Sequence, residues 1–258
     1  MRSIVVAATA ILSLTSGIAS AALPAGFTVS VEAAGVQNTT ATFDYYGIET
    51  FDLAPLGQGS YNAGFGNGPI SGTYTGLNVI GSNQYGGAGG AGQYAVAGLG
   101  SSDRSYSIDF TNTGANGVNY FGYWLSALDA GNMLEFYSGA NLLGTFSPTD
   151  VISFVGLQGP YYGNPNGGQN AGEPYVFVNF FMNDQSSSFD RIVFKQAPGS
   201  AGYESDNHTV GWYKDLGDGT VVPSVPEPGT WAMMMAGFGV MGWRMRRRSS
   251  AAAVSVTA

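Results

Sequence analysis

Cysteine is absent from this sequence, and histidine occurs once, as His208. Without cysteine the chain has no disulfide and no thiolate nucleophile. A zinc site would have to combine one histidine with carboxylates, which is an unusual set of ligands. A Ser-His-Asp triad would have to use His208, and no Gly-x-Ser-x-Gly elbow accompanies it. The sequence therefore gives no indication of a cysteine hydrolase, a zinc hydrolase or a serine hydrolase.

Charged residues are also scarce, at 10% of the chain. Of the 9 basic residues, Arg2 and four arginines near the C-terminus lie in the terminal segments, as does Glu227 among the 17 acidic residues. The part between them therefore has 4 basic and 16 acidic residues, a net charge of about −12. Such a surface repels polyanions, so we expect no nucleic-acid binding. A Gly-x-Gly-x-x-Gly match at 87–92 lacks the strand and helix that nucleotide binding requires, so no nucleotide is expected.

The first 21 residues have the three parts of a secretory signal peptide. Arg2 is the charged start, residues 4–14 are the apolar part, and Ala19-Ser20-Ala21 is an A-x-A-like cleavage site. The apolar part is too short to anchor the chain in a membrane. We therefore expect export through the Sec translocon, with Ala19 and Ala21 directing cleavage.

Near the other end, a stiff turn, an apolar run and a basic cluster follow one another. Pro226-Glu227-Pro228 is the turn, because proline fixes φ and has no N–H to donate. The apolar run, residues 230–243, would form a helix about 21 Å long, against a hydrocarbon core of about 30 Å. We expect a short transmembrane helix there, stopped on the cytoplasmic side by Arg244, Arg246, Arg247 and Arg248.

In order and spacing, these residues resemble the PEP-CTERM family, in the variant with Trp-Ala after Pro-Glu-Pro. The residues that carry the resemblance are Pro226, Glu227, Pro228, Trp231 and Ala232, with the closing arginines. In that family, the tail of an exported protein of a Gram-negative bacterium is recognised by an exosortase, a membrane-embedded transpeptidase, and cut near the Pro-Glu-Pro. The resemblance implies an exosortase partner, transient anchoring in the inner membrane, and a final place on the cell surface or outside the cell. Residues 249–258 would be a short cytoplasmic extension.

Residues 22–220 are predicted to form one all-β domain, a β-sandwich or jelly roll. Glycine, Asn, Ser and Thr separate short runs of aromatic and β-branched residues, as is typical of strands and turns. Apolar and polar residues alternate at 27–32 and 105–110, and the aromatic run 118–128 indicates a central strand. We expect a glycine-rich loop region over 56–92, either a long loop or irregular strands, together with one short helix opening at 147–150 and a linker at 221–225.

A dense polar stretch, residues 203–209, offers the strongest candidate for a ligand site. Glu204, Asp206 and Asn207 place several oxygens within a few residues, which suits Ca²⁺, although the spacing is not that of an EF-hand. The alternative is that these side chains hydrogen-bond a loop backbone and fix the last strand, as Asx turns do. No other cofactor is indicated.

The activity of the domain is left open between three classes. The first is a non-enzymatic surface or matrix protein associated with exopolysaccharide, and a weaker resemblance of residues 106–213 to ectodomains of exosortase-dependent surface proteins supports it. The second is a lectin-like carbohydrate-binding module with a structural calcium. Its stacking platform would be the tyrosines at 61, 74, 85, 94, 161 and 162, and the alternative is that these side chains cap the ends of the sandwich. The third is a secreted hydrolase that uses two facing carboxylates.

Overall fold

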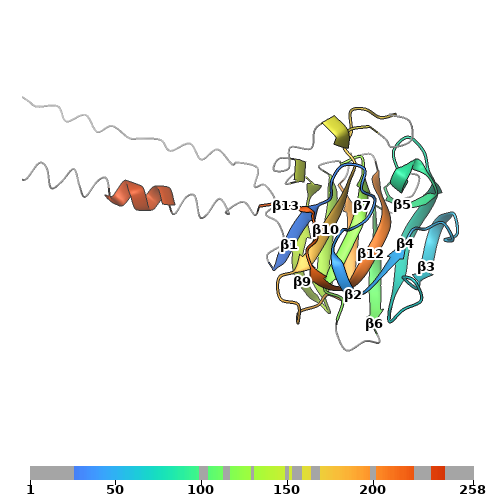
Figure 1. Ribbon diagram of the computed structural model, residues 1–258, viewed down its shortest axis with the longest axis horizontal. Coiled ribbons are helices and arrows are strands. Elements are labelled where there is room, and N and C mark those ends of the chain that lie inside the picture. Colours follow the sequence, from blue (N-terminus) through green and yellow to red (C-terminus); the bar gives the residue numbers. More distant parts are fainter. Residues whose placement is uncertain are drawn as a thin grey trace, which may run out of the picture.

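The computed structural model describes residues 26–98, 104–112, 117–128, 131–148, 151–152, 159–163, 169–197, 202–223 and 234–241. Nearly all the regular structure in these ranges is β-strand (Figure 1). The strands are β1 (Phe27–Val31), β2 (Thr42–Glu49), β3 (Gly57–Ala63), β4 (Ile70–Gly81), β5 (Gln93–Ala97), β6 (Ser105–Asn112), β7 (Tyr120–Ser126), β8 (Asn132–Ser138), β9 (Asn141–Phe146), β10 (Val176–Met182), β11 (Arg191–Gln196), β12 (Tyr203–Asp215) and β13 (Thr220–Val221). Two short 3-10 turns are η1 (Ala88–Gly90) and η2 (Gly159–Tyr161).

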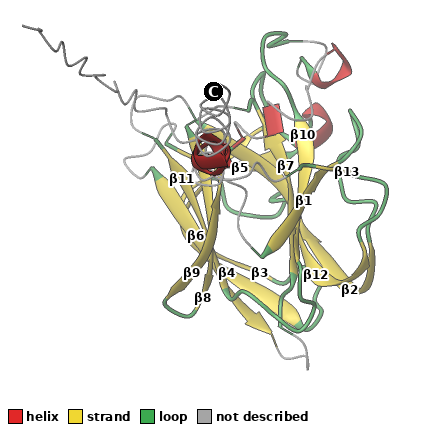
Figure 2. Cartoon of the chain, turned by 90° about the vertical axis from the view of Figure 1, so that its left-hand side faces the viewer, coloured by secondary structure: helices red, strands yellow, loops and turns green. Residues whose placement is uncertain are grey.

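The described strands form one 13-stranded antiparallel sheet that folds over on itself. Its order is β13-β1-β10-β7-β12-β5-β4-β6-β11-β8-β9, with β2 beside β12 and β3 beside β4. Figure 2 shows the half that contains β1, β10, β7 and β12 facing the half that contains β4, β6, β11 and β8. Rings meet across the gap, with centroids 6.1 Å apart for Phe121 and Phe194 and 5.0 Å for Phe136 and Phe180. The two halves are thus the layers of a sandwich, which confirms the predicted all-β fold.

The central strands β7 and β10 are buried along their whole length. Their inward rings pack across the sandwich. Their outward rings join two further apolar clusters, one with Trp124 and Phe177 and the other with Tyr120 and Phe181. A strand that is covered on both faces has no solvent-facing positions, so its sequence is a continuous apolar run. This explains the aromatic run that indicated a central strand in the sequence.

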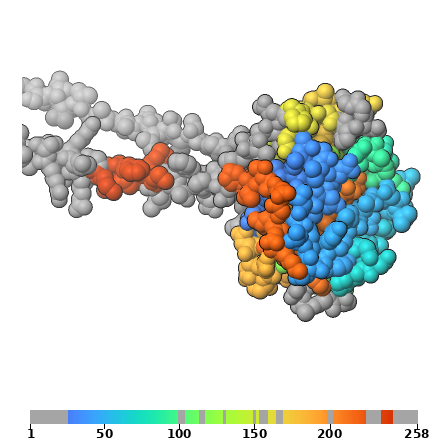
Figure 3. Space-filling model, viewed as in Figure 1, coloured from blue at the N-terminus to red at the C-terminus, as the bar shows by residue number. Residues whose placement is uncertain are grey.

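The segment between β1 and β2 covers the outer face of this layer. Glu32, which is 1% exposed, accepts hydrogen bonds there from the Thr40 N–H at 2.9 Å and from Asn179 Nδ2 at 2.9 Å. In Figure 3 the first strands (blue) and the segment of β12 and β13 (orange) lie side by side, as expected from the pairings of β1 with β13 and of β2 with β12. The two ends of the domain are therefore tied together by backbone ladders.

Of the two alternatives for the glycine-rich region 56–92, strands and not a long loop are found over most of its length. Residues 57–63 and 70–81 are strands β3 and β4, paired with each other. The first half of β4 alternates between buried and exposed residues, but Gly72 fills one of the inward positions. A Cβ there would lie 2.9 Å from the Phe65 ring, so the glycine makes room for an aromatic neighbour. A glycine has no apolar side chain, so the alternation of buried and exposed positions in β4 could not be recognised from the sequence.

Two smaller features of the domain are local in the sequence. Ser138 pairs with Asn141 across a tight β8–β9 hairpin, where Gly139 has a φ of 58°. Pro148, Val151 and Ile152 have helical backbone, as the proline at the start of the predicted helix indicated.

Residues 234–241 form a helix in which every side chain is exposed. None of them joins a hydrophobic cluster, and the main cluster ends, in chain order, at Val222. Among the helices that the structure describes, none combines the length and the apolar character needed to cross a membrane.

Candidate functional site

The predicted ligand stretch 203–209 lies in a strand and not in a loop. It forms the first half of β12, where β12 is held between β7 and β5. Glu204 and Asp206 are only 4% and 3% exposed. The outward residues Glu204 and Asp206 alternate with Tyr203 and Ser205, which face the core, and this is the pattern of a strand with one polar face.

Asp206 fixes the η1 turn to the sheet. Its Oδ2 accepts a hydrogen bond from the Ala88 N–H, and its Oδ1 accepts one from the Asn207 N–H, both at 2.7 Å. Burial raises the pKa of the Asp206 carboxyl to about 7, because the charged form loses its hydration and the two N–H donors only partly replace it. The Asp206 side chain therefore has a structural role, which is to hold the η1 turn against β12.

Asn207 marks an irregularity in β12. Its φ is 48°, and the register between β12 and β7 shifts between Asp206 and Thr209, as in a β-bulge. The side chain points toward another segment, since Nδ2 donates to the Gln37 carbonyl at 2.9 Å.

The three predicted calcium ligands therefore have protein partners or packed surroundings. Glu204 lies against the backbone at Gly202, where an added Cβ would come within 2.1 Å of Oε1. In the described ranges, no group of three His, Cys, Asp or Glu side chains is arranged to hold a metal ion. Calcium binding by Glu204, Asp206 and Asn207 stays a prediction.

His208 is enclosed between the two layers. It is fully buried, stacks on Phe194 at 5.0 Å, and lies 3.0 Å from both the Tyr74 hydroxyl (at Nδ1) and the Ser205 hydroxyl (at Nε2). Ser205 is in turn 2.7 Å from the Tyr106 hydroxyl. Burial lowers the pKa of His208 to about 3, so the imidazole is neutral near pH 7. This hydrogen-bonded chain orders the core and is closed to solvent.

The tyrosines proposed as a stacking platform do not form one. Tyr74 and Tyr94 are fully buried in the domain, and burial raises the pKa of both hydroxyls above its usual value. Tyr85 and Tyr162 are exposed, at 40% and 39%. The proposed platform is wrong because its members alternate between core and surface positions of different strands and turns.

A polar surface that the sequence reading missed lies on the outer side of the second layer. We call it the β6–β11 face; it consists of outward residues of β4, β6, β11 and β8. Cross-strand register sets them in rows. One row runs Thr73, Asp109, Arg191, Tyr137, and the next runs Thr75, Ser107, Val193, Glu135.

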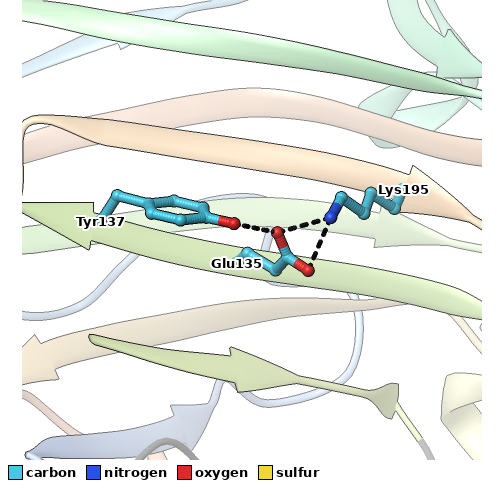
Figure 4. Close-up of polar contacts among 3 residues, drawn as sticks. All are labelled: Glu135, Tyr137 and Lys195. Carbon is cyan, nitrogen blue, oxygen red and sulfur yellow. Dashed lines mark hydrogen bonds and ion pairs between the residues drawn. The ribbon is translucent and has the colours of Figure 1, made fainter. Parts of the chain in front are cut away.

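An ion pair fixes one side of this face. Lys195 Nζ lies 2.7 Å from each oxygen of Glu135, and the Tyr137 hydroxyl donates to Glu135 Oε2 at 2.6 Å (Figure 4). The hydrogen bond to the carboxylate, together with some burial, raises the pKa of Tyr137. The Arg191 guanidinium lies over the Tyr137 ring, 4.4 Å from its centroid.

Beside this cluster the surface is hollowed into a groove of about 420 Å³. Its side-chain lining includes Thr75, Ser105, Ser107, Asp109, Arg191 and Val193. Alternation at 105–110 located the outward residues of β6, but only the fold shows that β11, more than eighty residues later, lies next to β6.

Comparison with known proteins identifies the C-terminal segment. Residues 224–248 match the family described as PEP-CTERM protein-sorting motif. The chain carries a PEP-CTERM sorting motif. The PEP-CTERM motif makes it an exported protein whose sorting depends on an exosortase. No curated protein and no solved structure is significantly similar to the chain.

The PEP-CTERM motif covers the predicted sorting residues and begins two residues after Val222, the last core residue. Several predicted residues lie outside the described ranges: the sorting residues Pro226, Glu227, Pro228, Trp231 and Ala232, the arginines 244 and 246–248, and the cleavage residues Ala19 and Ala21. Of the motif, the structure describes the helix at 234–241.

Proposed function

We propose that the protein is a non-enzymatic component of the cell surface or extracellular matrix that associates with exopolysaccharide. It is held in the inner membrane by its C-terminal helix only until an exosortase cuts near Pro226-Glu227-Pro228. The β-sandwich is then the cargo that acts outside the cell.

The observation that carries this proposal is the position of the PEP-CTERM motif relative to the core. The motif occupies 224–248, whereas every residue of the three hydrophobic clusters lies between Phe27 and Val222. Among the residues that the structure describes, a cut after residue 225 therefore removes no core side chain and leaves the ladders of β12 and β13 intact. Such a tail can be exchanged or removed without unfolding the domain.

Two features of the domain favour binding over catalysis. The single histidine is enclosed in the core with its pKa lowered to about 3, so it cannot exchange protons with a substrate at the surface near pH 7. Of the two carboxylates on the β6–β11 face, Glu135 is engaged by Lys195 and Tyr137. The groove beside them offers hydroxyl, carboxylate and guanidinium groups, the types of group that bind sugars.

Fractionation of the producing bacterium with intact-mass measurement tests the proposal. We expect a fragment that begins after Ala21 and ends near Pro226 or Pro228 at the surface or in the medium. In a strain without the exosortase, the protein should stay in the membrane fraction with its tail. Replacement of Pro226-Glu227-Pro228 by three alanines should have the same effect, whereas a matched replacement within residues 249–258 should not.

An unprocessed protein at the surface of the wild-type strain would contradict the proposal. So would release of the same fragment from the strain that lacks the exosortase, because the cut would then belong to another protease.

A further inference from the structure

The β6–β11 face combines fixed and free polar groups, and the difference between them indicates a binding site. Lys195, Glu135 and Tyr137 satisfy one another. Asp109 and Arg191 face each other in the register of β6 and β11, yet among the described residues neither side chain has an ion-pair or hydrogen-bond partner. Arg191 Nε is buried and has no acceptor. Because Nε has almost no accessible surface, the groups that a ligand in the groove can meet are the Asp109 carboxylate and the other N–H groups of the Arg191 guanidinium.

Packing holds the Arg191 guanidinium in place. Its carbon lies 4.4 Å from the centre of the Tyr137 ring, and the Tyr137 hydroxyl is itself fixed by Glu135. Stacking leaves the edge of the guanidinium, which carries its N–H donors, available to a partner. The side chain is therefore ordered before any ligand arrives, which lowers the entropic cost of binding.

The charges around the groove narrow the class of ligand. The exported part has only 4 basic residues, and three of them, Arg104, Arg191 and Lys195, belong to or adjoin β6 and β11. With Glu135 paired to Lys195, the free charges that line the groove are one acid and one base, Asp109 and Arg191. A polyanion would meet Asp109 and a polycation would meet Arg191. A neutral ligand with many hydroxyl groups can donate to the carboxylate and accept from the guanidinium at once.

The shape of the groove agrees with a chain-like ligand. Hydroxyl side chains at Thr75, Ser105 and Ser107 continue the lining, and Val193 gives it an apolar floor. Neighbouring strands lie about 4.8 Å apart, close to the length of one sugar ring, so successive rings can meet successive rows of side chains. A volume of about 420 Å³ lies in the range of ligand pockets and fits a short stretch of polymer.

We propose that this groove binds a neutral polysaccharide, with Asp109 and Arg191 hydrogen-bonding neighbouring hydroxyls of the same sugar. The inference deepens and rests on the proposed association with exopolysaccharide, and it assigns that association to one face of the sandwich.

Affinity electrophoresis tests the assignment. The full-length protein, purified in a detergent without a sugar headgroup, is run in native gels that contain dextran, a soluble β-glucan, galactomannan, alginate or the host's own exopolysaccharide. We expect at least one neutral polymer to slow the wild type. We expect R191Q and D109N each to weaken that binding at least about tenfold, because each removes a charge-assisted hydrogen bond.

The matched control is K214Q, which removes a positive charge from the exposed Lys214–Asp44 pair elsewhere on the domain. K214Q should bind as the wild type does. Thermal unfolding of each variant separates lost binding from lost folding, and D109N, at an exposed position, keeps the test valid if R191Q is unstable.

Each contrary result has a distinct meaning. Binding that is unchanged in R191Q and D109N would overturn the groove and leave the association with polysaccharide standing. Retardation by alginate alone would overturn the neutral class of ligand. No retardation by any polymer, the host's own included, would overturn both the groove and the association, while the result of fractionation would still decide the sorting.

Discussion

Asp206 is a buried carboxyl that titrates in the neutral range because the sheet and the η1 turn exclude water from it. Its pKa is raised from 3.8 to about 7. The folded chain therefore holds this proton to a higher pH than the unfolded chain does, so the contribution to stability is greatest below about pH 4 and falls as the pH rises to about 7. A difference of about three pKa units corresponds to about 4 kcal/mol.

Substitution D206N should remove this dependence. The amide keeps one acceptor, so the variant should be less stable at pH 4, but the deficit should shrink or reverse between pH 4 and pH 8. Urea unfolding at several pH values gives the difference in free energy of unfolding between wild type and variant. A difference that stays constant with pH would show that Asp206 is already ionised in the folded protein at low pH.

His208 has the opposite effect on the pH dependence of stability. Its pKa is lowered to about 3 in the folded chain, so the unfolded chain binds the proton first as the pH falls. The stability that neutral His208 contributes is complete above about pH 6.5 and is lost as the pH falls toward 3. Because the stability depends on pH, the free energies of unfolding of wild type and variants are compared at the same pH.

We expect H208Q to be destabilised by about 2–4 kcal/mol at pH 7, since Tyr74 and Ser205 would lose a shared partner in the core. H208Q should also lose less stability than the wild type between pH 7 and pH 4.5. The control is Y74F, which removes one hydroxyl, keeps the histidine, and should keep the acid sensitivity. Equal acid sensitivity in H208Q and wild type would contradict the buried neutral imidazole.

At the scale of elements, glycines decide how closely β2 approaches the turn before β4. A Cβ on Gly47 would lie 1.8 Å from the Phe65 carbonyl oxygen, which is backbone and cannot move aside. A Cβ on Gly59 in β3 would meet nothing within 4 Å. The contact at Gly47 is with a residue 18 positions later, so the local sequence of β2 does not reveal it.

We therefore expect G47A to destabilise the domain by about 3 kcal/mol or more, and G59A to be neutral or slightly stabilising. Thermal and urea unfolding of the two variants beside the wild type provide the measurement. Similar stability of both variants would mean that β2 can move away from Phe65 at little cost.

The strands that could be predicted are those whose side chains show the period of two. β6 is an example, since Tyr106 and Ile108 are buried while Ser105 and Asp109 are exposed. β4 could not be read in this way, because Gly72 takes an inward position and has no side chain to mark it. Nor could Glu204 and Asp206 be placed in a buried strand. Polar residues are expected at the surface, and the segment that covers Asp206, around Ala88, is more than one hundred residues away in the sequence.

At the scale of the whole molecule, the sandwich and the PEP-CTERM motif are separate units. The core ends at Val222, and the helix at 234–241 adds no residue to it. A chain that ends at residue 225 should therefore unfold cooperatively and within about 2 °C of the full-length protein, since it keeps every core side chain that the structure describes. Circular dichroism of both forms tests this. Loss of the cooperative transition in the shorter chain would show that the tail supports the fold.

The sequence by itself determined that the protein is exported and sorted by an exosortase, and it determined the class of the fold. A sorting motif is recognised as a linear order of residues, so Pro226-Glu227-Pro228 and the segment after it can be identified without a structure, as the match at 224–248 confirms. Only the tertiary structure decided which polar residues meet. Asp109, Arg191 and Tyr137 come from three strands that local periodicity cannot pair, and their row exists because the folded sheet places β6, β11 and β8 side by side.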